Sequence, residues 1–220
     1  MIRVLVCDDH VIVRQGIKQI LADAGDVTLA GEADSGPEAV RLVRDAAQGH
    51  EPIDVVLMDI AMPQRDGLDV LRQLKNEFPR LPVLMLSTYP DKQYAVRSLK
   101  LGASGYLNKS ADSEQMIAAI RKVAHGGLFI TPAVAEHLAA SVAAGPAQGA
   151  EAPLHERLSN REYQVFQLLA SGRSVGELAQ QLSLSSNTVS TYRTRILEKT
   201  QARNDVELAL YAMRSDLIPA

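Results

Sequence analysis

The chain has 220 residues, which is enough for two ordinary domains that each bury a core of their own. Hydrophobic residues make up 46% and charged residues 22%, a balance that excludes a wholly disordered chain. No apolar run approaches the about 18 residues needed to cross a bilayer, and the amino terminus lacks a signal-peptide pattern. Cys7 is the single cysteine, so no internal disulfide can form. We therefore expect a cytoplasmic protein without membrane contacts.

Neither half of the chain has the strong positive charge that is typical of nucleic-acid binding. Residues 1–124 carry 15 Lys and Arg against 17 Asp and Glu, and residues 153–220 carry 8 against 7. Any prediction of DNA binding must therefore rest on a motif.

The first 125 residues alternate short apolar runs with helical patterns. The expected strands are residues 2–7, 27–33, 53–58, 81–87 and 104–108. The expected helices are residues 12–24, 36–47, 67–77, 91–101 and 112–125. Near-continuous apolar strands such as "VVLM" suit a parallel sheet that is covered by helices on both faces. Five such units predict an α/β domain with a doubly wound, five-stranded parallel sheet.

A further helix and a linker follow this domain. Thr131 is a suitable N-cap, with Pro132 at the first helical position, for a helix over about 131–143. The next segment, "AGPAQGAEAP" (144–153), has no hydrophobic period and is typical of a flexible linker. All later patterns are helical. We expect three parts, residues 1–125, an extra helix and linker over 126–153, and a small all-α domain over 154–220.

Charged and hydroxyl side chains follow four of the five expected strands. In a doubly wound parallel sheet the carboxyl ends of the strands share one edge, where ligands bind. The side chains at these ends are Asp8 and Asp9 after the first strand, Asp59 at the third, Ser87 and Thr88 at the fourth, and Lys109 after the fifth. We therefore expect them to form one site.

Clustered carboxylates repel one another, and a hard divalent cation such as Mg²⁺ is the usual relief. Asp8 and Asp9 are adjacent and suited to hold such an ion, which leaves Asp59 as the candidate nucleophile for an acyl phosphate. Lys109 would offset charge on the phosphoryl group, and Ser87 would donate a hydrogen bond to it. Taken singly, a strand-end Asp is often only a helix cap and a Lys a surface charge. Their joint occurrence favours the site.

Four motifs in this half, "CDDH", "LMDIAMPQRDGLDVL", "LMLST" and "GASGYLNKS", resemble in order and spacing those of the receiver domain of two-component response regulators. The resemblance implies a flavodoxin-like fold and phosphotransfer from a phosphohistidine of a sensor histidine kinase to Asp59. It implies that Ser87 and Lys109 contact the phosphoryl group. It also assigns Tyr106 to an aromatic switch position, although an ordinary half-buried strand aromatic explains that residue equally well.

The same resemblance implies a Mg²⁺ site. The ion would be held by Asp9, by Asp59 and by the backbone carbonyl of Ala61, with Asp8 binding through water.

The turns beside the acceptor strand also follow the family. Pro63 and Gly67 match the turn after that strand. A departure is Pro90, which stiffens a loop that the family moves on activation.

Residues 158–214 are expected to form four helices. Ser159 and Glu162 make a capping box at the start of the first helix. The other three are expected over 175–182, 187–200 and 205–213. The short turn "SLSS" between the second and third is typical of a helix-turn-helix, whose second helix enters the major groove of DNA.

The helix over 187–200 has two different faces. Its core face is expected to carry Val189, Tyr192, Ile196 and Leu197. Small hydroxyl side chains on the other face can touch base edges, and the flanking cations suit phosphates. The candidate DNA contacts are Thr188, Ser190, Thr191, Arg193, Thr194, Arg195 and Lys199. Alone, such a helix would be an ordinary solvated basic face, but its place behind a short turn favours DNA.

Three longer motifs, "LSNREYQVFQLLASG", "ELAQQLSLSSNTVSTYRTRILEK" and "RNDVELALYA", resemble the LuxR-type DNA-binding domain. The resemblance implies docking on double-stranded DNA and dimer contacts from the last helix, where Leu208, Leu210 and Tyr211 are either contacts or core. Tyr192 and Ser190 replace a frequent His and a frequent Lys of the family, so the operator is expected to differ from that of other members.

Together the halves resemble a NarL/FixJ-type response regulator, a phosphorylation-controlled transcription factor that is a homodimer when active and not an enzyme. A Mg²⁺-dependent aspartyl-phosphate phosphohydrolase would share the acids and the lysine. It usually needs a second acid two residues after the nucleophile, where this chain has Ala61. A ligand-sensing LuxR-type regulator would need an apolar pocket in its first half. Both alternatives rank below the response regulator.

Overall fold

The computed structural model describes residues 1–49, 51–62, 65–88, 92–143, 153–215 and 217–218. The chain divides into two compact units, Met1–Ala139 and Ala140–Ala220. Apart from Pro153, the predicted linker lies outside the described residues, as do Pro63 and Pro90. No helix among the described residues is long and apolar enough to span a bilayer.

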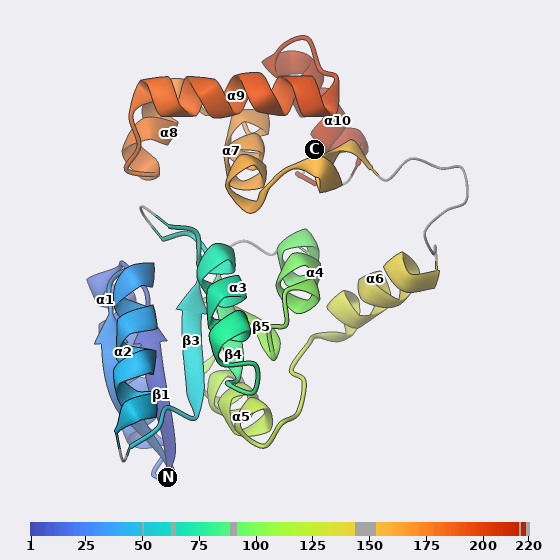
Figure 1. Cartoon of the computed structure of the whole chain (residues 1–220). Helices are drawn as coiled ribbons and strands as arrows, with labels where there is room; N and C mark the ends of the chain where they lie inside the picture. The colour runs from blue at the N-terminus through green and yellow to red at the C-terminus, as the bar shows by residue number, and fades with distance from the viewer. Residues whose placement is uncertain (50, 63–64, 89–91, 144–152, 216, 219–220) are drawn as a thin grey trace. The chain divides into compact units, whose positions relative to one another are not determined.

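The first unit is built on a sheet of five strands, all parallel. They are β1 (Ile2–Cys7), β2 (Val27–Ala33), β3 (Val55–Asp59), β4 (Val83–Ser87) and β5 (Gly105–Asn108). Their order across the sheet is β2-β1-β3-β4-β5 (Figure 1). This arrangement confirms the predicted doubly wound fold, although β3 and β4 each begin two residues later than expected.

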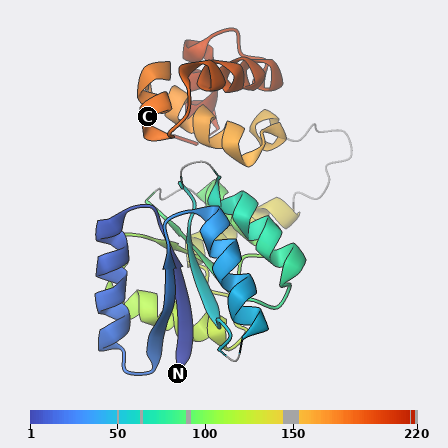
Figure 2. The ribbon, with the colours of Figure 1, turned by 60° about the vertical axis from the view of Figure 1, so that its left-hand side comes forward.

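Helices cover both faces of the sheet. They are α1 (Val11–Asp23), α2 (Gly36–Gln48), α3 (Gly67–Glu77), α4 (Lys92–Lys100) and α5 (Ser113–Ala124). In Figure 2, α1 lies on the opposite side of the sheet from α2 and α3. Strand residues alternate between the faces. The core that contains α1 and α5 side chains takes every second residue of the central strands: Val4, Val6, Val55, Leu57, Leu84 and Leu86.

The segment after α5 covers the outer edge of β5, which the sequence did not predict. Phe129 donates its backbone N–H to the Ser104 carbonyl at 2.9 Å, and its carbonyl accepts the Tyr106 N–H at 3.1 Å. A Cβ on Gly105 would lie 2.6 Å from the Phe129 carbonyl oxygen, so only glycine allows this approach. The contact blocks an exposed strand edge. The following helix α6 (Pro132–Ala143) starts after the predicted cap Thr131, whose Oγ1 accepts the Val134 N–H at 3.4 Å.

The second unit is helical throughout its described residues. It contains a short 3-10 helix η1 (Leu154–Arg157) and then α7 (Asn160–Ala170), α8 (Val175–Gln181), α9 (Ser186–Thr200) and α10 (Asp205–Arg214). The predicted capping box of Ser159 and Glu162 is present at the start of α7, and α8 has a second one from Ser174 and Glu177. Helix α7 packs against both α9 and α10, around the fully buried Phe166.

Candidate functional site

The first acidic residue, Asp8, directly follows β1 and is fully buried. Its backbone is held on two sides, because its N–H donates to the Ala33 carbonyl at 3.1 Å and its carbonyl accepts from Arg14 Nη1 at 2.6 Å. Parallel pairing of β1 with β2 and β3 therefore brings its carboxylate to the carboxyl edge of the sheet.

Lys109 joins Asp8 to Asp59, the last residue of β3. Its Nζ lies 2.6 Å from Asp8 Oδ2 and 3.0 Å from Asp59 Oδ2, and only 9% of the lysine side chain is exposed. The lysine backbone is anchored as well, since its N–H donates to the Ser87 carbonyl at 2.7 Å. Residues from three strand ends thus meet in one buried ion-pair cluster, as the sequence predicted.

The pKa values in this cluster reflect competition between burial and charge. The pKa of the Asp59 carboxyl is raised, mainly by burial and also by the nearby Asp8 carboxylate. Lys109 and the Ala61 N–H oppose this shift without cancelling it. For Lys109, burial lowers the pKa, but Asp59 and Asp8 outweigh it, so the net shift is upward. Lys109 therefore stays protonated at neutral pH, and the ionised form of Asp59 is held against a cost of desolvation.

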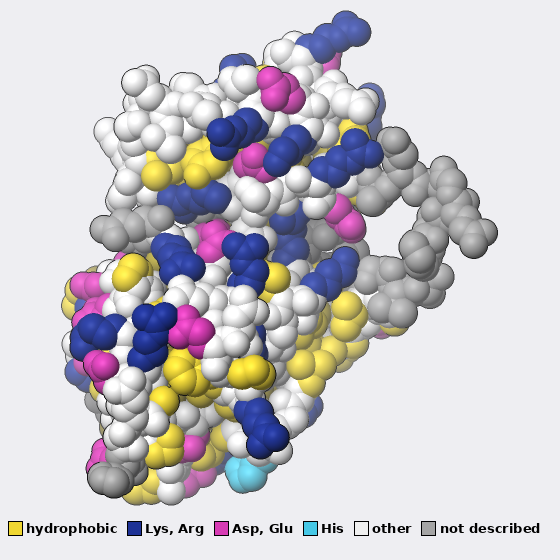
Figure 3. Space-filling view, viewed as in Figure 1, with side chains coloured by type: hydrophobic (Ala, Val, Ile, Leu, Met, Phe, Trp, Pro, Cys, Tyr) yellow, Lys and Arg dark blue, Asp and Glu magenta, His cyan; other side chains and the backbone are white. Residues whose placement is uncertain are grey.

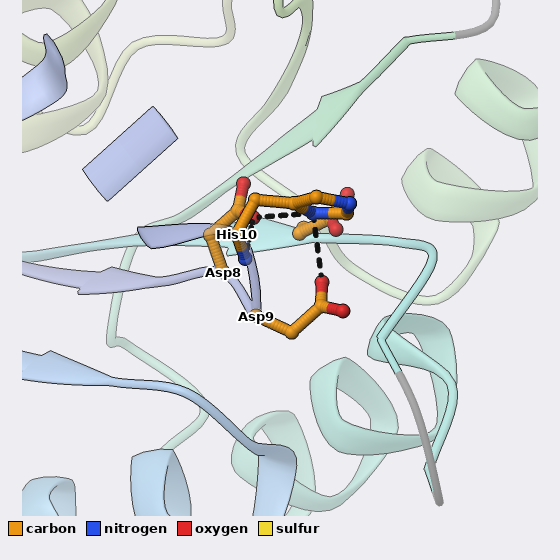
Figure 4. Close-up of side chains that lie close together, drawn as sticks. Asp8, Asp9 and His10 are labelled. Atoms are coloured by element: carbon orange, nitrogen blue, oxygen red, sulfur yellow. Dashed lines mark hydrogen bonds and ion pairs between the residues drawn. The ribbon is translucent and has the colours of Figure 1, made fainter. Parts of the chain in front are cut away.

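Asp9 and His10 complete the cluster at its solvent side. The His10 ring lies between the Asp8 and Asp9 carboxylates (Figure 4), with Nδ1 at 3.1 Å from Asp8 Oδ1 and 3.0 Å from Asp9 Oδ1. One ligand atom from each of Asp8, Asp9, His10 and Asp59 lies within 4.8 Å of the others. Carboxylate oxygens gathered in this way are the kind of ligand that suits a hard divalent cation. No role was predicted for His10 from the sequence, although it follows the two acids directly in "CDDH".

The turn after β3 is shaped by Asp66 and Gly67. Asp66 caps α3 by accepting the Leu68 N–H at 2.8 Å. Gly67 donates its N–H to the Ile60 carbonyl at 2.9 Å, and a Cβ at this position would lie 2.0 Å from the Asp59 carbonyl oxygen. Any side chain there would push on the backbone of Asp59, so the predicted glycine is a steric requirement.

Ser87 and Tyr106 occupy the neighbouring strands β4 and β5. Ser87 ends β4 and is 2% exposed, opposite Asn108 in register. Tyr106 is 6% exposed and lies opposite Met85. Both side chains are thus inside the unit, whereas Thr88 is exposed.

A separate pocket of about 640 Å³ lies at the other end of the sheet. Its lining includes Ile53 and Asp54, which precede β3, and Pro82, which precedes β4. Because these residues come before their strands, the pocket is at the amino edge of the sheet, away from Asp8, Asp9 and Asp59.

In the second unit, α9 presents the two faces that the sequence predicted. Val189 and Ile196 are fully buried, and Tyr192 and Leu197 are half-buried. On the outer side, the exposed residues among the candidate DNA contacts are Ser190, Thr191, Thr194 and Arg195. The hydroxyls of Thr191 and Thr194 donate to the carbonyls four residues earlier and keep their oxygen lone pairs as acceptors. Thr188 Oγ1 lies 2.8 Å from the hydroxyl of the cap Ser185.

Two of the three cations predicted to contact phosphates are engaged within the unit. Arg193 Nε donates to Asp205 at 2.8 Å, and Lys199 Nζ lies 2.6 Å from Glu162 Oε2. Among the described residues Arg195 has no acidic partner within ion-pair distance. On the visible face of this unit, Figure 3 shows Lys and Arg side chains with Asp and Glu side chains scattered among them.

The three residues considered for dimer contacts on α10 differ in exposure. Leu208 is fully buried and so belongs to the core. Tyr211 is half-buried, with its hydroxyl 2.9 Å from His155 Nδ1. Leu210 is 46% exposed and shares a face with Val206 at 69% and Met213 at 43%. This apolar stripe was not fully identified from the sequence.

The two units match two protein families. Residues 4–121 match the model described as "Response regulator receiver domain", and residues 156–212 match "Bacterial regulatory proteins, luxR family". The chain belongs to the two-component response regulators. Members of this family act as DNA-binding regulators of transcription whose activity depends on phosphorylation.

Relatives agree over the full length. The response regulator GacA of Pseudomonas aeruginosa is 38% identical over 220 residues, covering 100% of this chain and 99% of GacA. UvrY of Escherichia coli is 36% identical, covering 100% of this chain and 97% of UvrY.

Solved structures share the fold. A LuxR-family response regulator from Aurantimonas has a TM-score of 0.57 and 27% identity, covering 64% of this chain and 97% of the other. RcsB of Salmonella typhimurium has a TM-score of 0.66 and 24% identity, covering 99% and 98%, which shows a common fold.

We predict that removing the carboxylate of Asp59 raises the free energy of unfolding, whereas removing the ammonium of Lys109 lowers it. Asp59→Asn removes a carboxylate disfavoured by burial and leaves Lys109 with Asp8, so the free energy of unfolding should rise by about 1 kcal/mol in metal-free buffer. Lys109→Met leaves two buried carboxylates without a cation and should lower it by about 3 kcal/mol. Urea unfolding followed by circular dichroism measures both changes.

Asp45→Asn is the matched control. Asp45 is 62% exposed and pairs with Arg41 on the surface of α2, a contact worth less than about 1 kcal/mol. Equal destabilisation by Asp59→Asn and Lys109→Met would contradict this electrostatic account.

Proposed function

We propose that a sensor histidine kinase phosphorylates this response regulator on Asp59, and that phosphorylation controls its dimerisation and its sequence-specific binding to DNA. The observation that carries the proposal is the buried bridge of Lys109 between Asp8 and Asp59 at the carboxyl edge of the sheet. It supplies a nucleophilic carboxylate and a fixed positive charge within 3.0 Å of each other.

In the proposed transfer, a carboxylate oxygen of Asp59 attacks the phosphorus of the kinase phosphohistidine. The phosphorus–nitrogen bond breaks, the electron pair returns to the imidazole, and an acyl phosphate forms on Asp59. Lys109 offsets negative charge on the transferred group because its ammonium already contacts the Asp59 carboxylate. Ser87, at the end of the neighbouring strand, donates a hydrogen bond to a phosphoryl oxygen.

Mg²⁺ is the proposed cofactor, held by Asp9, Asp59 and the Ala61 carbonyl, with Asp8 binding through water. The clustered carboxylates fit such an ion, since their oxygens lie within 4.8 Å of one another. When bound, it neutralises charge on the carboxylates and on the phosphoryl group.

The proposed output is binding of double-stranded DNA by α9. Its exposed hydroxyl groups face outward beside Arg195, a combination suited to base edges and phosphates. RcsB of Salmonella typhimurium, a response regulator 25% identical to this chain, has a solved structure that addresses its conformational dynamism for DNA interaction. Because the DNA target of a bacterial regulator is cytoplasmic, we propose that this protein acts in the cytoplasm.

The proposed switch begins with the negative charge that phosphorylation adds beside Lys109. Ser87 and Tyr106 change position in response, and the equilibrium shifts from a form with α9 covered to an open form that dimerises on DNA. The exposed stripe of Val206, Leu210 and Met213 on α10 is the proposed dimer surface.

Asp59→Asn should abolish covalent labelling by radioactive acetyl phosphate, because the acceptor oxygen is replaced by an amide. It should also abolish any acetyl-phosphate-dependent gain in DNA affinity, measured by fluorescence anisotropy with a duplex selected from a random pool. Asp45→Asn is again the control and should label normally. Labelling of Asp59→Asn would place the acceptor elsewhere, and a preserved affinity gain without labelling would refute the switch.

Arg195→Ala should weaken binding to selected and unrelated duplexes by a similar factor. If Arg195 contacts a phosphate, the slope of log affinity against log salt should decrease in magnitude by about 1. Arg214→Ala removes the same charge from an exposed site on α10 and serves as the control. An unchanged slope in Arg195→Ala would show that this side chain makes no phosphate contact.

Leu210→Glu should prevent dimerisation of the phosphorylated protein, since it places a charge in the apolar stripe of α10. Sedimentation velocity with acetyl phosphate should then show a monomer. Gln181→Glu adds the same charge to an exposed position at the end of α8 and should leave the dimer intact. A Leu210→Glu protein that still dimerises would move the interface away from α10.

A further inference from the structure

His10 is the one member of the metal-ligating cluster that is not a carboxylate. Its side chain is 61% exposed, yet its Nδ1 faces the acids at 3.1 Å from Asp8 Oδ1 and 3.0 Å from Asp9 Oδ1 (Figure 4). The imidazole therefore stands at the mouth of the site, with one nitrogen directed inward.

The orientation of Asp8 does not depend on this ring. The backbone N–H of His10 already donates to Asp8 Oδ1 at 2.9 Å, and Lys109 binds the other oxygen at 2.6 Å. A hydrogen bond from the ring adds a third contact to a carboxylate that is already held. The inward nitrogen is thus available for another task.

The spacing of His10 Nδ1 and Asp9 Oδ1 suits neighbouring ligands of one ion. Adjacent ligands of an octahedral ion with bonds of about 2.1 Å lie about 3.0 Å apart. Nδ1 lies 3.0 Å from Asp9 Oδ1, and one atom of Asp59 falls within the same 4.8 Å cluster. A modest displacement of the exposed ring would let it share an ion with the acids.

We infer that His10 is a metal ligand of this site and biases it from Mg²⁺ toward divalent transition ions such as Co²⁺ and Ni²⁺. Carboxylate sites suit Mg²⁺, whereas an imidazole nitrogen adds affinity for transition ions. The inference rests on the metal site of the proposed function and adds the chemical class of its occupant.

The test compares Ni²⁺ and Mg²⁺ affinities of the full chain by isothermal titration calorimetry. His10→Phe removes the nitrogen from a mostly exposed position and should lower Ni²⁺ affinity at least ~tenfold, with Mg²⁺ affinity within about twofold of wild type. His10→Asn offers an amide oxygen instead and should shift the affinity ratio toward Mg²⁺. His125→Phe is the matched control, because His125 is an exposed histidine that bonds the Arg121 carbonyl outside the cluster.

Pulsed electron paramagnetic resonance gives a direct signature. Bound Mn²⁺ should show coupling to a directly ligated ¹⁴N nucleus in wild type and in His125→Phe, and this coupling should be absent in His10→Phe. Persistence of the coupling in His10→Phe would overturn the inference.

These experiments distinguish a failure of the His10 inference from a failure of the proposed phosphorylation of Asp59. If His10→Phe lowers Ni²⁺ and Mg²⁺ affinity equally, or changes neither, His10 is no selective ligand and the inference is overturned. Labelling by acetyl phosphate is compared between wild type, His125→Phe and Asp59→Asn, so the proposed function is tested by Asp59→Asn and does not depend on any His10 variant. Failure of the wild-type chain to bind either ion overturns the inference and the proposed metal site together.

Discussion

The receiver unit depends on one ammonium group, that of Lys109, placed between the carboxylates of Asp8 and Asp59. The three residues come from the ends of β1, β3 and β5, and the lysine must reach across the end of β4. An unpaired charge buried at any of these ends would cost several kcal/mol. The ion pairs therefore make the acidic edge possible, and they also fix where negative charge can be added later. A phosphoryl group on Asp59 would enter a site that already contains its counter-charge.

The same lysine offers a short physical route from the acceptor to the neighbouring strands. Its backbone N–H bonds the Ser87 carbonyl, so its main chain cannot shift without affecting the end of β4. Tyr106 lies three residues earlier on β5, and its backbone N–H is in turn bonded to Phe129. On the opposite side, Gly67 packs so closely on the Asp59 carbonyl that the turn after β3 must follow any movement of that strand. These contacts connect Asp59 and Lys109 to the end of β4, to the segment around Phe129 and to the turn after β3.

The parts of this structure that could be predicted are those governed by a local or topological rule. Strand-end acids converge because a parallel sheet aligns its carboxyl ends, and the cap of Ser159 is readable because its partner is three residues away. Contacts that depend on folded geometry were missed. The pairing of Phe129 with β5 has no periodic signal, and the pairing of Arg193 with Asp205 joins two helices. His10 was overlooked because one imidazole beside two acids is weak evidence until its ring direction is known.

In the helical unit, two cations form ion pairs between helices, whereas the receiver unit gathers its charges in one buried cluster. Arg193 and Lys199 on α9 pair with Asp205 and Glu162, which lie on α10 and α7, and so they help to hold the three helices together. A DNA phosphate that bound either cation would have to compete with a carboxylate already 2.6–2.8 Å away. If α9 is the DNA-binding helix, as proposed, charge neutralisation would contribute less affinity than the number of cations on α9 suggests, and the exposed hydroxyls and Arg195 would contribute more. Binding by a single copy would then be weak, and DNA occupancy would depend on whether two copies bind together.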